Sequence, residues 1–378
     1  MQDRKDFLLL PLEIYKNDSN WIRPLDRDIE AVFDKDKNKF FRHGECTRWI
    51  LKNDSGKVRG RVAAFYNKKT AGKNEQPTGG IGFFECINNA ETAFILFDTC
   101  KKWLSEKGME AMDGPVNFGE RDSWWGLIVK GFDSPPYKMN YNPTYYKNFF
   151  EEYGFKIYFE QYCYSLKVMA QLQEKFYRRH EAIKSNPDYK AVYFKKNQLK
   201  KFAGDFRIIY NKAWAHHGGG KELDSKQVLM FFKKMKPVID EKIIWFVYYK
   251  NEPVAMWVNL PDINQLFKML NGKFGWLEKI RFIWMLKRSR TKKFIGLVFG
   301  VIPEHQGKGV DSFMIVDGAN FIQKEKLYED FEMQWIGDFN PKMVAICEDL
   351  GTWRSRTLIT YRYLFDRTKE FKRHLIFN

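Results

Sequence analysis

A short polar stretch between an apolar segment and an amphipathic one has the residue types best suited to bind an anion. Residues 294–302 are β-prone and uncharged, and residues 312–324 repeat apolar side chains at helical spacing. Between these segments lies Gln306-Gly307-Lys308-Gly309. Glycine lets a backbone approach an anion closely, and the free amides of a helix's first turn can donate to it. The pattern predicts a phosphate-binding turn, although glycines in strand-to-helix turns also serve geometry alone.

The residues around these glycines are similar to a known motif. The stretch Pro303 to Gly309 resembles motif A of the GNAT superfamily of acyl-CoA-dependent N-acyltransferases, in which a Q/R-x-x-G-x-G/A loop binds the coenzyme A pyrophosphate. Asp311 stands at the sixth position, where that family prefers Gly or Ala. A carboxylate facing the ligand would repel phosphate, so Asp311 either points away as a helix-start residue or weakens binding.

The resemblance implies acetyl-CoA or another acyl-CoA as the cofactor. It also implies two parallel strands that splay apart, so that one strand edge offers its backbone groups to the pantetheine arm. The residues expected to bind the cofactor are Val298, Phe299, Gly300, Val301, Gln306, Gly307, Lys308, Gly309, Val310, Asp311 and Asn340.

Composition bounds the class of protein. The chain has 378 residues, which exceeds one average domain, and 44% of them are hydrophobic, as in globular proteins. A net charge of +17 suits coenzyme A, tRNA, DNA or an anionic bilayer about equally. Five scattered cysteines without C-x-x-C spacing argue against a disulfide framework or a metal site, and no run approaches about twenty apolar residues. These features predict a cytoplasmic protein.

Two Asn-Pro pairs mark an internal repeat. Asn142-Pro143 and Asn340-Pro341 each follow a similar series of strands and a helix, about one domain length apart. We therefore expect an α/β (α+β) chain of two tandem domains, residues 1–168 and 169–378. Each domain resembles a GNAT unit, which implies a twisted mixed, mostly antiparallel sheet flanked by helices.

The two halves differ where a cofactor would bind. The first-half turn that corresponds to the glycine turn contains Glu85 and Glu91 and no glycine, so we expect an anion site only in the second half. The first half also has an insertion at about 113–140, rich in Gly, Pro and aromatic residues. It is either a rigid cover over the domain boundary or a wall of the substrate pocket. With residues 141–146 and 210–214, it resembles a family of long bacterial tandem-GNAT proteins, over approximately residues 1 to 370.

The resemblance also implies a reaction. A neutral amine attacks the thioester, a backbone amide stabilises the oxyanion, and an acid protonates the departing thiolate. GNAT enzymes commonly use a motif B tyrosine as this acid, but the corresponding positions here are Cys347 and, in the first half, Phe150. Cys347 is either a proton donor or a small core residue. Asp338 is a candidate base by position, and His216 is either a base or part of a flexible polar loop.

Residues 276–293 indicate further partners. An apolar helical segment there ends in a basic cluster. It could lie on an anionic bilayer, contact RNA phosphates, or pack on the protein and end in solvated charge. The acceptor implied by the family is a small-molecule or peptide amine. The alternatives are an aminoacyl-tRNA-dependent transferase of tandem-GNAT type and a non-catalytic ligand-binding protein.

Overall fold

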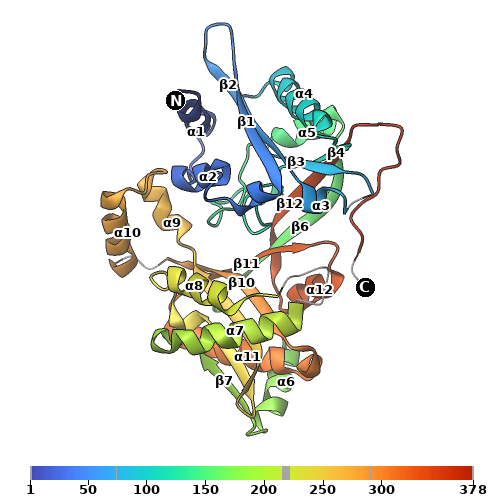
Figure 1. Ribbon diagram of the computed structural model, residues 1–378. Helices are drawn as coiled ribbons and strands as arrows, with labels where there is room; N and C mark the ends of the chain where they lie inside the picture. Colours follow the sequence, from blue (N-terminus) through green and yellow to red (C-terminus); the bar gives the residue numbers. More distant parts are fainter. Residues whose placement is uncertain (1, 74, 215–221, 289–290, 377–378) are drawn as a thin grey trace.

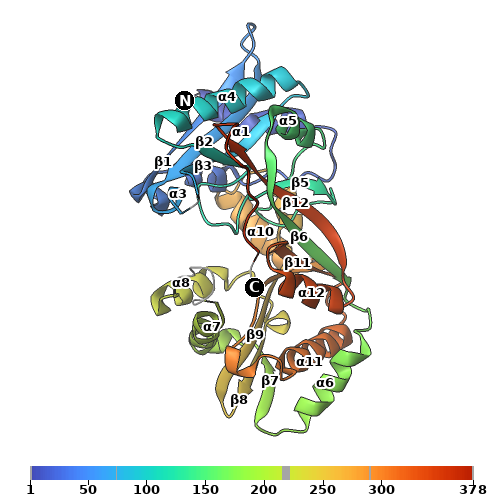
Figure 2. The same ribbon diagram turned by 90° about the vertical axis from the view of Figure 1, so that its right-hand side faces the viewer.

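One twelve-stranded sheet runs through both halves of the chain, as the computed structural model shows (Figure 1). The structure describes residues 2–73, 75–214, 222–288 and 291–376. The first half lies at the top of Figure 1 and the second half at the bottom, with β6 and β12 crossing between them. Figure 2, turned by 90°, shows the same division.

The strands alternate with helices that cover the sheet. The strands are β1 (Gly44–Lys52), β2 (Val58–Asn67), β3 (Thr78–Cys86), β4 (Ala111–Gly114), β5 (Leu127–Lys130), β6 (Lys156–Lys167), β7 (Tyr189–Tyr193), β8 (Trp245–Tyr249), β9 (Glu252–Pro261), β10 (Lys293–Val301), β11 (Asp330–Gly337) and β12 (Trp353–Leu364). The α-helices are α1 (Gln2–Ile14), α2 (Asp26–Phe33), α3 (Lys68–Ala71), α4 (Ala90–Glu106), α5 (Tyr146–Tyr153), α6 (Glu174–Lys184), α7 (Leu199–Trp214), α8 (Ser225–Met235), α9 (Asn264–Phe267), α10 (Trp276–Arg288), α11 (Val310–Glu325) and α12 (Pro341–Asp349). The short 3-10 helices are η1 (Lys39–Arg42), η2 (Lys196–Gln198), η3 (Glu241–Ile243), η4 (Lys268–Leu270) and η5 (Pro303–His305).

The two halves have the same strand order, except that the last strand of each half lies in the part of the sheet that belongs to the other half. The order is β1-β2-β3-β4-β12-β6-β11-β10-β9-β8-β7, with β5 also pairing with β12. Two strand pairs are parallel, β3 with β4 and β10 with β11, and the other pairs are antiparallel. The last strand of the first half, β6, lies beside β11, and the last strand of the second half, β12, lies beside β4. Each half thus completes the sheet of the other.

The hydrophobic cores follow this exchange. The core of the second half packs α7, α8 and α11 against β8, β9 and β10. The core of the first half packs α4 and α5 against the sheet, and it includes Ile359, Tyr361 and Tyr363 from β12. The domain boundary at residue 168 stays a prediction. In the structure, β12, which follows this boundary in the chain, contributes to the first-half core.

A buried ionic cluster joins the two halves. Arg356 of β12 is 1% exposed, and its Nε donates to Oε1 of Glu332 at 2.8 Å. The other carboxylate oxygen of Glu332 accepts from Lys293 Nζ at 2.8 Å. The Arg356 guanidinium also donates to the carbonyls of Gly131, Asp133 and Ser134 in the insertion. Removing one member of the cluster would leave a buried charge uncompensated, so the ionic contacts are costly to break. Through the three carbonyls, the cluster holds the insertion against the sheet.

Candidate active site

The site begins where two parallel strands separate. The parallel pairing of β10 and β11 is limited to residues 293–296 and 330–333. On its other side β10 stays paired with β9 as far as Val301, with an irregularity between Gly296 and Val298. Beyond Gly296, the edge of β10 that faces β11 therefore has no strand partner among the described residues. Its amides and carbonyls are available to an extended ligand.

A cavity of about 500 Å³ lies between these diverging strands. This volume falls in the range of roughly 300–1,000 Å³ that small-molecule sites typically occupy. Apolar side chains from both strands, α11 and α12 form most of its wall. The lining includes Trp257, Leu297, Val298, Phe299, Ile315, Ala319, Phe331, Met333, Trp335, Ile336, Phe339, Met343, Ile346 and Leu350. The cavity suits an apolar chain.

The glycine turn begins α11 as the sequence indicated. Gly307 and Gly309 have φ of +71° and +85°, backbone conformations that favour glycine. Gly309 is the N-cap of α11 and provides no side-chain cap. The side chain of Gln306 holds the turn to the strand, because its Nε2 donates to the carbonyl of Val301 at 2.9 Å. Within the described part of the chain, no acceptor meets the backbone amides of residues 307–310.

These features fit a phosphate group at the start of α11. The free amides lie at the positive end of the helix dipole. The hydroxyl of Ser312, in the first turn, is fully buried and has no partner among the described residues. Lys308 is exposed beside the amides, and a side chain added at Gly307 would meet open space. Asp311 is half-buried in the same turn.

The first half closes the corresponding site in two ways. Where β3 would separate from β4, the chain turns back and the Val116 amide donates to the Ile81 carbonyl at 2.7 Å. A Cβ at Gly82 would lie 1.9 Å from the Val116 carbonyl oxygen, so this segment fills the gap. The N-terminus of α4 is also occupied, because the Asn89 side chain accepts from the Thr92 amide at 2.7 Å. A ligand would have to displace both contacts.

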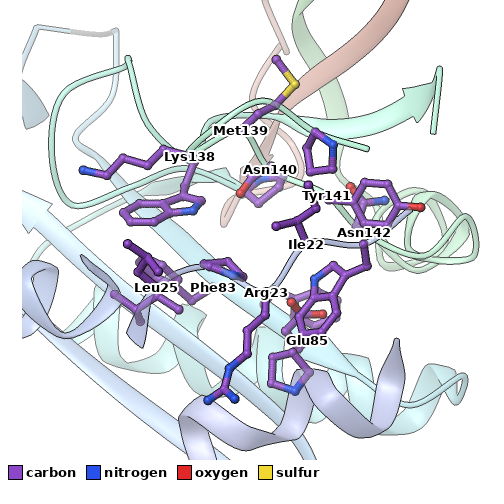
Figure 3. A pocket seen from close by; sticks show the side chains of 18 of the residues that line it. Ile22, Arg23, Leu25, Phe83, Glu85, Lys138, Met139, Asn140, Tyr141 and Asn142 are labelled. Atoms are coloured by element: carbon purple, nitrogen blue, oxygen red, sulfur yellow. The ribbon is translucent and has the colours of Figure 1, made fainter. Parts of the chain in front are cut away.

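Glu85 of the first half lies in a buried polar cluster. Its carboxylate accepts from the hydroxyls of Tyr15 at 2.8 Å and Tyr146 at 2.9 Å, and it pairs with Arg61 at 3.5 Å. Burial raises the pKa of Glu85. Figure 3 shows Glu85 on the wall of a pocket of about 70 Å³, across from residues 138–142 of the insertion and its continuation. The cluster connects the residue that follows α1 with β2, β3 and α5.

The two predicted catalytic residues that the structure describes, Cys347 and Asp338, do not line the same cavity. Cys347 lines the large cavity, is 0% exposed, and burial raises its thiol pKa to about 12. Asp338 is not in the cavity lining and forms an ion pair with Arg373, and burial raises its pKa. His216 lies outside the described residues.

The predicted cofactor residues fall into two groups. Val298, Phe299 and Asn340 line the cavity, and the Asn340 side chain also caps α12 by accepting from the Met343 amide at 3.3 Å. The other predicted cofactor residues lie outside the cavity lining. They are Gly300, Val301, Gln306, Gly307, Lys308, Gly309, Val310 and Asp311. They follow directly along the chain from the cavity wall into α11.

Most cavity residues were not recognised as individual candidates from sequence, and Arg121 and Tyr210 are polar examples. Arg121 is exposed and contributes a positive charge to the lining from the first-half insertion. Tyr210 of α7 is half-buried and brings a hydroxyl to the same lining. The only sequence signal for Arg121 was its place in an insertion rich in Gly, Pro and aromatic residues. The insertion both contributes to the cavity wall and spans the two halves through its contacts with Arg356.

Solved structures share this architecture. A tandem GNAT protein from the clavulanic acid biosynthesis pathway superposes with a TM-score of 0.52 at 9% identity, covering 97% of this chain and 96% of that one. The GCN5-related glucosamine N-acetyltransferase region of a fungal multi-domain β-N-acetylglucosaminidase gives a TM-score of 0.54 at 11% identity. That match covers 95% of this chain and 37% of the longer one. The fold is that of the tandem GNAT proteins.

Two curated proteins are similar along nearly their whole length. The bacterial ceramide synthase of Caulobacter vibrioides is 26% identical over 373 residues, covering 94% of each chain. Protein YghO of Escherichia coli is 25% identical over 362 residues, covering 92% of this chain and 90% of that protein. No protein-family model matches the chain.

Proposed function

We propose that this chain transfers an acyl group from an acyl-CoA to an amine, with the cofactor bound in the second half. The observation that carries this proposal is the apolar cavity of about 500 Å³ between β10 and β11, next along the chain to the uncapped start of α11. One end of this arrangement suits an acyl chain, and the other suits a pyrophosphate. An acyl-CoA has both an acyl chain and a pyrophosphate, and therefore matches both ends of the site.

Each part of the site has a role in this reaction. Coenzyme A, when bound, supplies the acyl group as a thioester. The amides of residues 307–310, with Lys308, bind its phosphates. The open edge of β10 donates to the pantetheine arm and to the negative charge that develops on the carbonyl oxygen. A C–N bond forms as the C–S bond breaks, and the proton lost by the amine ends on the thiolate.

The lining of the cavity favours a long acyl chain. The pantetheine arm would fill the part of the cavity along β10, and a fatty acyl chain would bury its methylene groups against the remaining apolar wall at about 0.8 kcal/mol each. The similarity to a protein named bacterial ceramide synthase supports the same class. Ceramides are amides of a fatty acid and a long-chain amino alcohol, so we propose a long-chain amino alcohol as the acceptor.

The test uses a matched pair of glycine variants. Gly307 and Gly108 both have positive φ, at +71° and +77°, and open space at the Cβ position. Asp is among the residues that tolerate this conformation best, so Gly307→Asp and Gly108→Asp impose similar strain. Only Gly307→Asp places a carboxylate at the proposed phosphate site. We expect it to weaken coenzyme A binding by roughly tenfold, since one like-charge contact at about 4 Å costs about 1 kcal/mol in water and about 4 kcal/mol near a protein surface, and about 1.4 kcal/mol is tenfold in affinity.

Binding of coenzyme A is measured by calorimetry. Product formation is measured by mass spectrometry of the amide formed from a long-chain acyl-CoA and an amino alcohol. Gly108→Asp should bind coenzyme A and form product like the unchanged protein. Equal binding by the two variants would place the cofactor elsewhere. Binding of tRNA in place of coenzyme A, with a steep loss between low and physiological salt, would favour the aminoacyl-tRNA alternative.

A further inference from the structure

Helix α10 is attached to the protein by one face. Phe282 is 7% exposed and Met285 is 2% exposed, and both pack with α9 and η4. The Phe282 ring stacks on Phe267 of α9 with centroids 4.9 Å apart, and it meets Phe274 edge-on at 5.6 Å. Figure 1 shows α10 beside α9 at the edge of the molecule. This anchoring fixes which side of the helix points away from the protein.

The opposite face of α10 is apolar and exposed. Its large side chains are 50 to 70% exposed, namely Trp276, Leu277, Ile280, Ile283 and Trp284. Their spacing along the helix, with neighbours three and four residues apart, places them on one continuous stripe. At 100° per residue, this stripe is centred nearly opposite Phe282 and Met285. An apolar stripe of this kind in water indicates an interaction surface.

Positive charges border the apolar stripe. Lys279, Arg281, Lys287 and Arg288 are exposed, and none forms an ion pair with a described carboxylate. Lys279 lies on one edge of the stripe, Arg281 and Arg288 lie on the other, and Lys287 is near the C-terminal end. The helix has one acidic residue, Glu278, which is half-buried on the side of the anchoring residues. The outward surface of α10 is therefore both apolar and cationic.

We propose that α10 lies in the surface of an anionic lipid bilayer. Trp and Ile side chains on one stripe would enter the boundary of the acyl chains, while flanking Lys and Arg side chains would meet lipid phosphates. RNA would require the cations at the centre of the contact, where this helix has Trp276, Ile280 and Trp284. No helix among the described residues is long and apolar enough to cross a bilayer. The contact is thus with one leaflet, and it is independent of the proposed acyl transfer.

The experiment is sedimentation of the full chain with lipid vesicles. We expect binding to vesicles of phosphatidylcholine with phosphatidylglycerol, and much weaker binding to phosphatidylcholine alone. The variant Trp276→Ser/Ile280→Ser/Trp284→Ser should lose roughly tenfold or more of this partitioning, because it removes most of the inserted apolar area. Since these side chains are exposed, the variant should fold, which circular dichroism checks.

The matched control changes an exposed apolar pair on a different helix. Met230 and Phe231 of α8 are 54% and 47% exposed, so Met230→Ser/Phe231→Ser removes exposed apolar surface without touching α10. It should bind vesicles normally. Lys279→Gln/Arg281→Gln/Arg288→Gln should weaken binding to anionic vesicles specifically.

Three results would overturn the proposal: no binding to anionic vesicles, equal loss in the α8 control, or a dimer in light scattering that only the α10 variant dissociates. The last result would assign the stripe to a second copy of the chain. Failure of acyl transfer would leave the vesicle result unaffected, so the two proposals fail separately.

Discussion

Replacing Cys347 by alanine tests whether the cavity wall provides the proton that the reaction requires. Counted from Asn340, Cys347 corresponds by prediction to the position of the motif B tyrosine of GNAT enzymes, and it lies in the cavity wall at 0% exposure. Its Sγ has the sulfur of Met333 at 3.9 Å as a neighbour. It packs with Tyr162, Tyr164 and Val344. These surroundings are apolar on the protein side.

The expected effect of Cys347→Ala on turnover follows from the thiol pKa. Burial raises the pKa of Cys347 to about 12. An ordinary thiol, such as the one that leaves from a thioester, titrates near about 8.5, so proton transfer from Cys347 to it is uphill by about 5 kcal/mol. A released thiolate is protonated by the buffered solvent at any pH below its own pKa of about 8.5, so it does not need this uphill transfer. We expect Cys347→Ala to keep near-normal turnover and to lose on the order of 1 kcal/mol of folding stability.

The assay compares Cys347→Ala with Cys100→Ala. Cys100 of α4 is also 0% exposed, but it lies in the first-half core, away from the cavity. Turnover is measured by mass spectrometry of the amide product, well below the melting temperature, and stability by urea denaturation. Both variants should lose similar stability and keep activity.

One outcome would refute this reasoning. If Cys347→Ala is stably folded but loses roughly a hundredfold in turnover, while Cys100→Ala remains active, then the thiol acts as the acid. That result would also require a bound substrate to lower the thiol pKa.

Three further predictions follow from the site and the fold. Calorimetry should find one coenzyme A per chain, because Val116 and Asn89 fill the first-half site, and a value of two would contradict this account. Ala319→Phe, which fills part of the cavity, should lower turnover with a long-chain acyl-CoA by roughly tenfold more than with acetyl-CoA, and an equal loss for both would place the acyl chain elsewhere. Burial raises the pKa of Asp262 to about 6, so the folded state keeps a proton that the unfolded state releases near about pH 4. Stability should therefore fall as pH rises from about 4 to 6, by up to about 3 kcal/mol. Asp262→Asn should flatten this slope in urea denaturation, and an unchanged slope would show that another group is responsible.

Several local features were predictable from the sequence because neighbouring residues decide them. The helix expected over 312–324 is α11 (Val310–Glu325). The glycines before it specify where it begins, and the spacing of its apolar residues specifies which face is buried. The apolar and aromatic residues of 242–249 also predict a strand. In the structure this strand begins later, at Trp245, because Asp240 caps the short helix η3 by accepting from the Lys242 amide at 3.0 Å. In the sequence alone, Asp262 and Asn264 could either orient an amine or form an Asx turn. The structure shows the turn, with the Asn264 amide donating to Asp262 Oδ1 at 3.2 Å.

The two Asn-Pro pairs show where a local pattern is insufficient. Asn340 caps its helix directly, with Pro341 at the first helical position. Asn142 instead bonds to the amide and carbonyl of Ile128 in β5, and α5 begins only at Tyr146. The dipeptide is the same, but the strand beside it decides what the asparagine side chain meets.

The sequence by itself determined the strand–turn–helix that forms the glycine turn and the lack of such a turn in the first half. These properties depend on residue type and short spacing, since φ preferences and helix periodicity act within a few residues. Tertiary structure alone decided that β6 and β12 exchange places, that Val116 closes the first-half gap, and that Arg356, paired with Glu332, joins the halves through carbonyls of the insertion. The reason is physical, because strand pairing and ion pairing depend on partners far along the chain, and many apolar strands could offer an equally suitable edge.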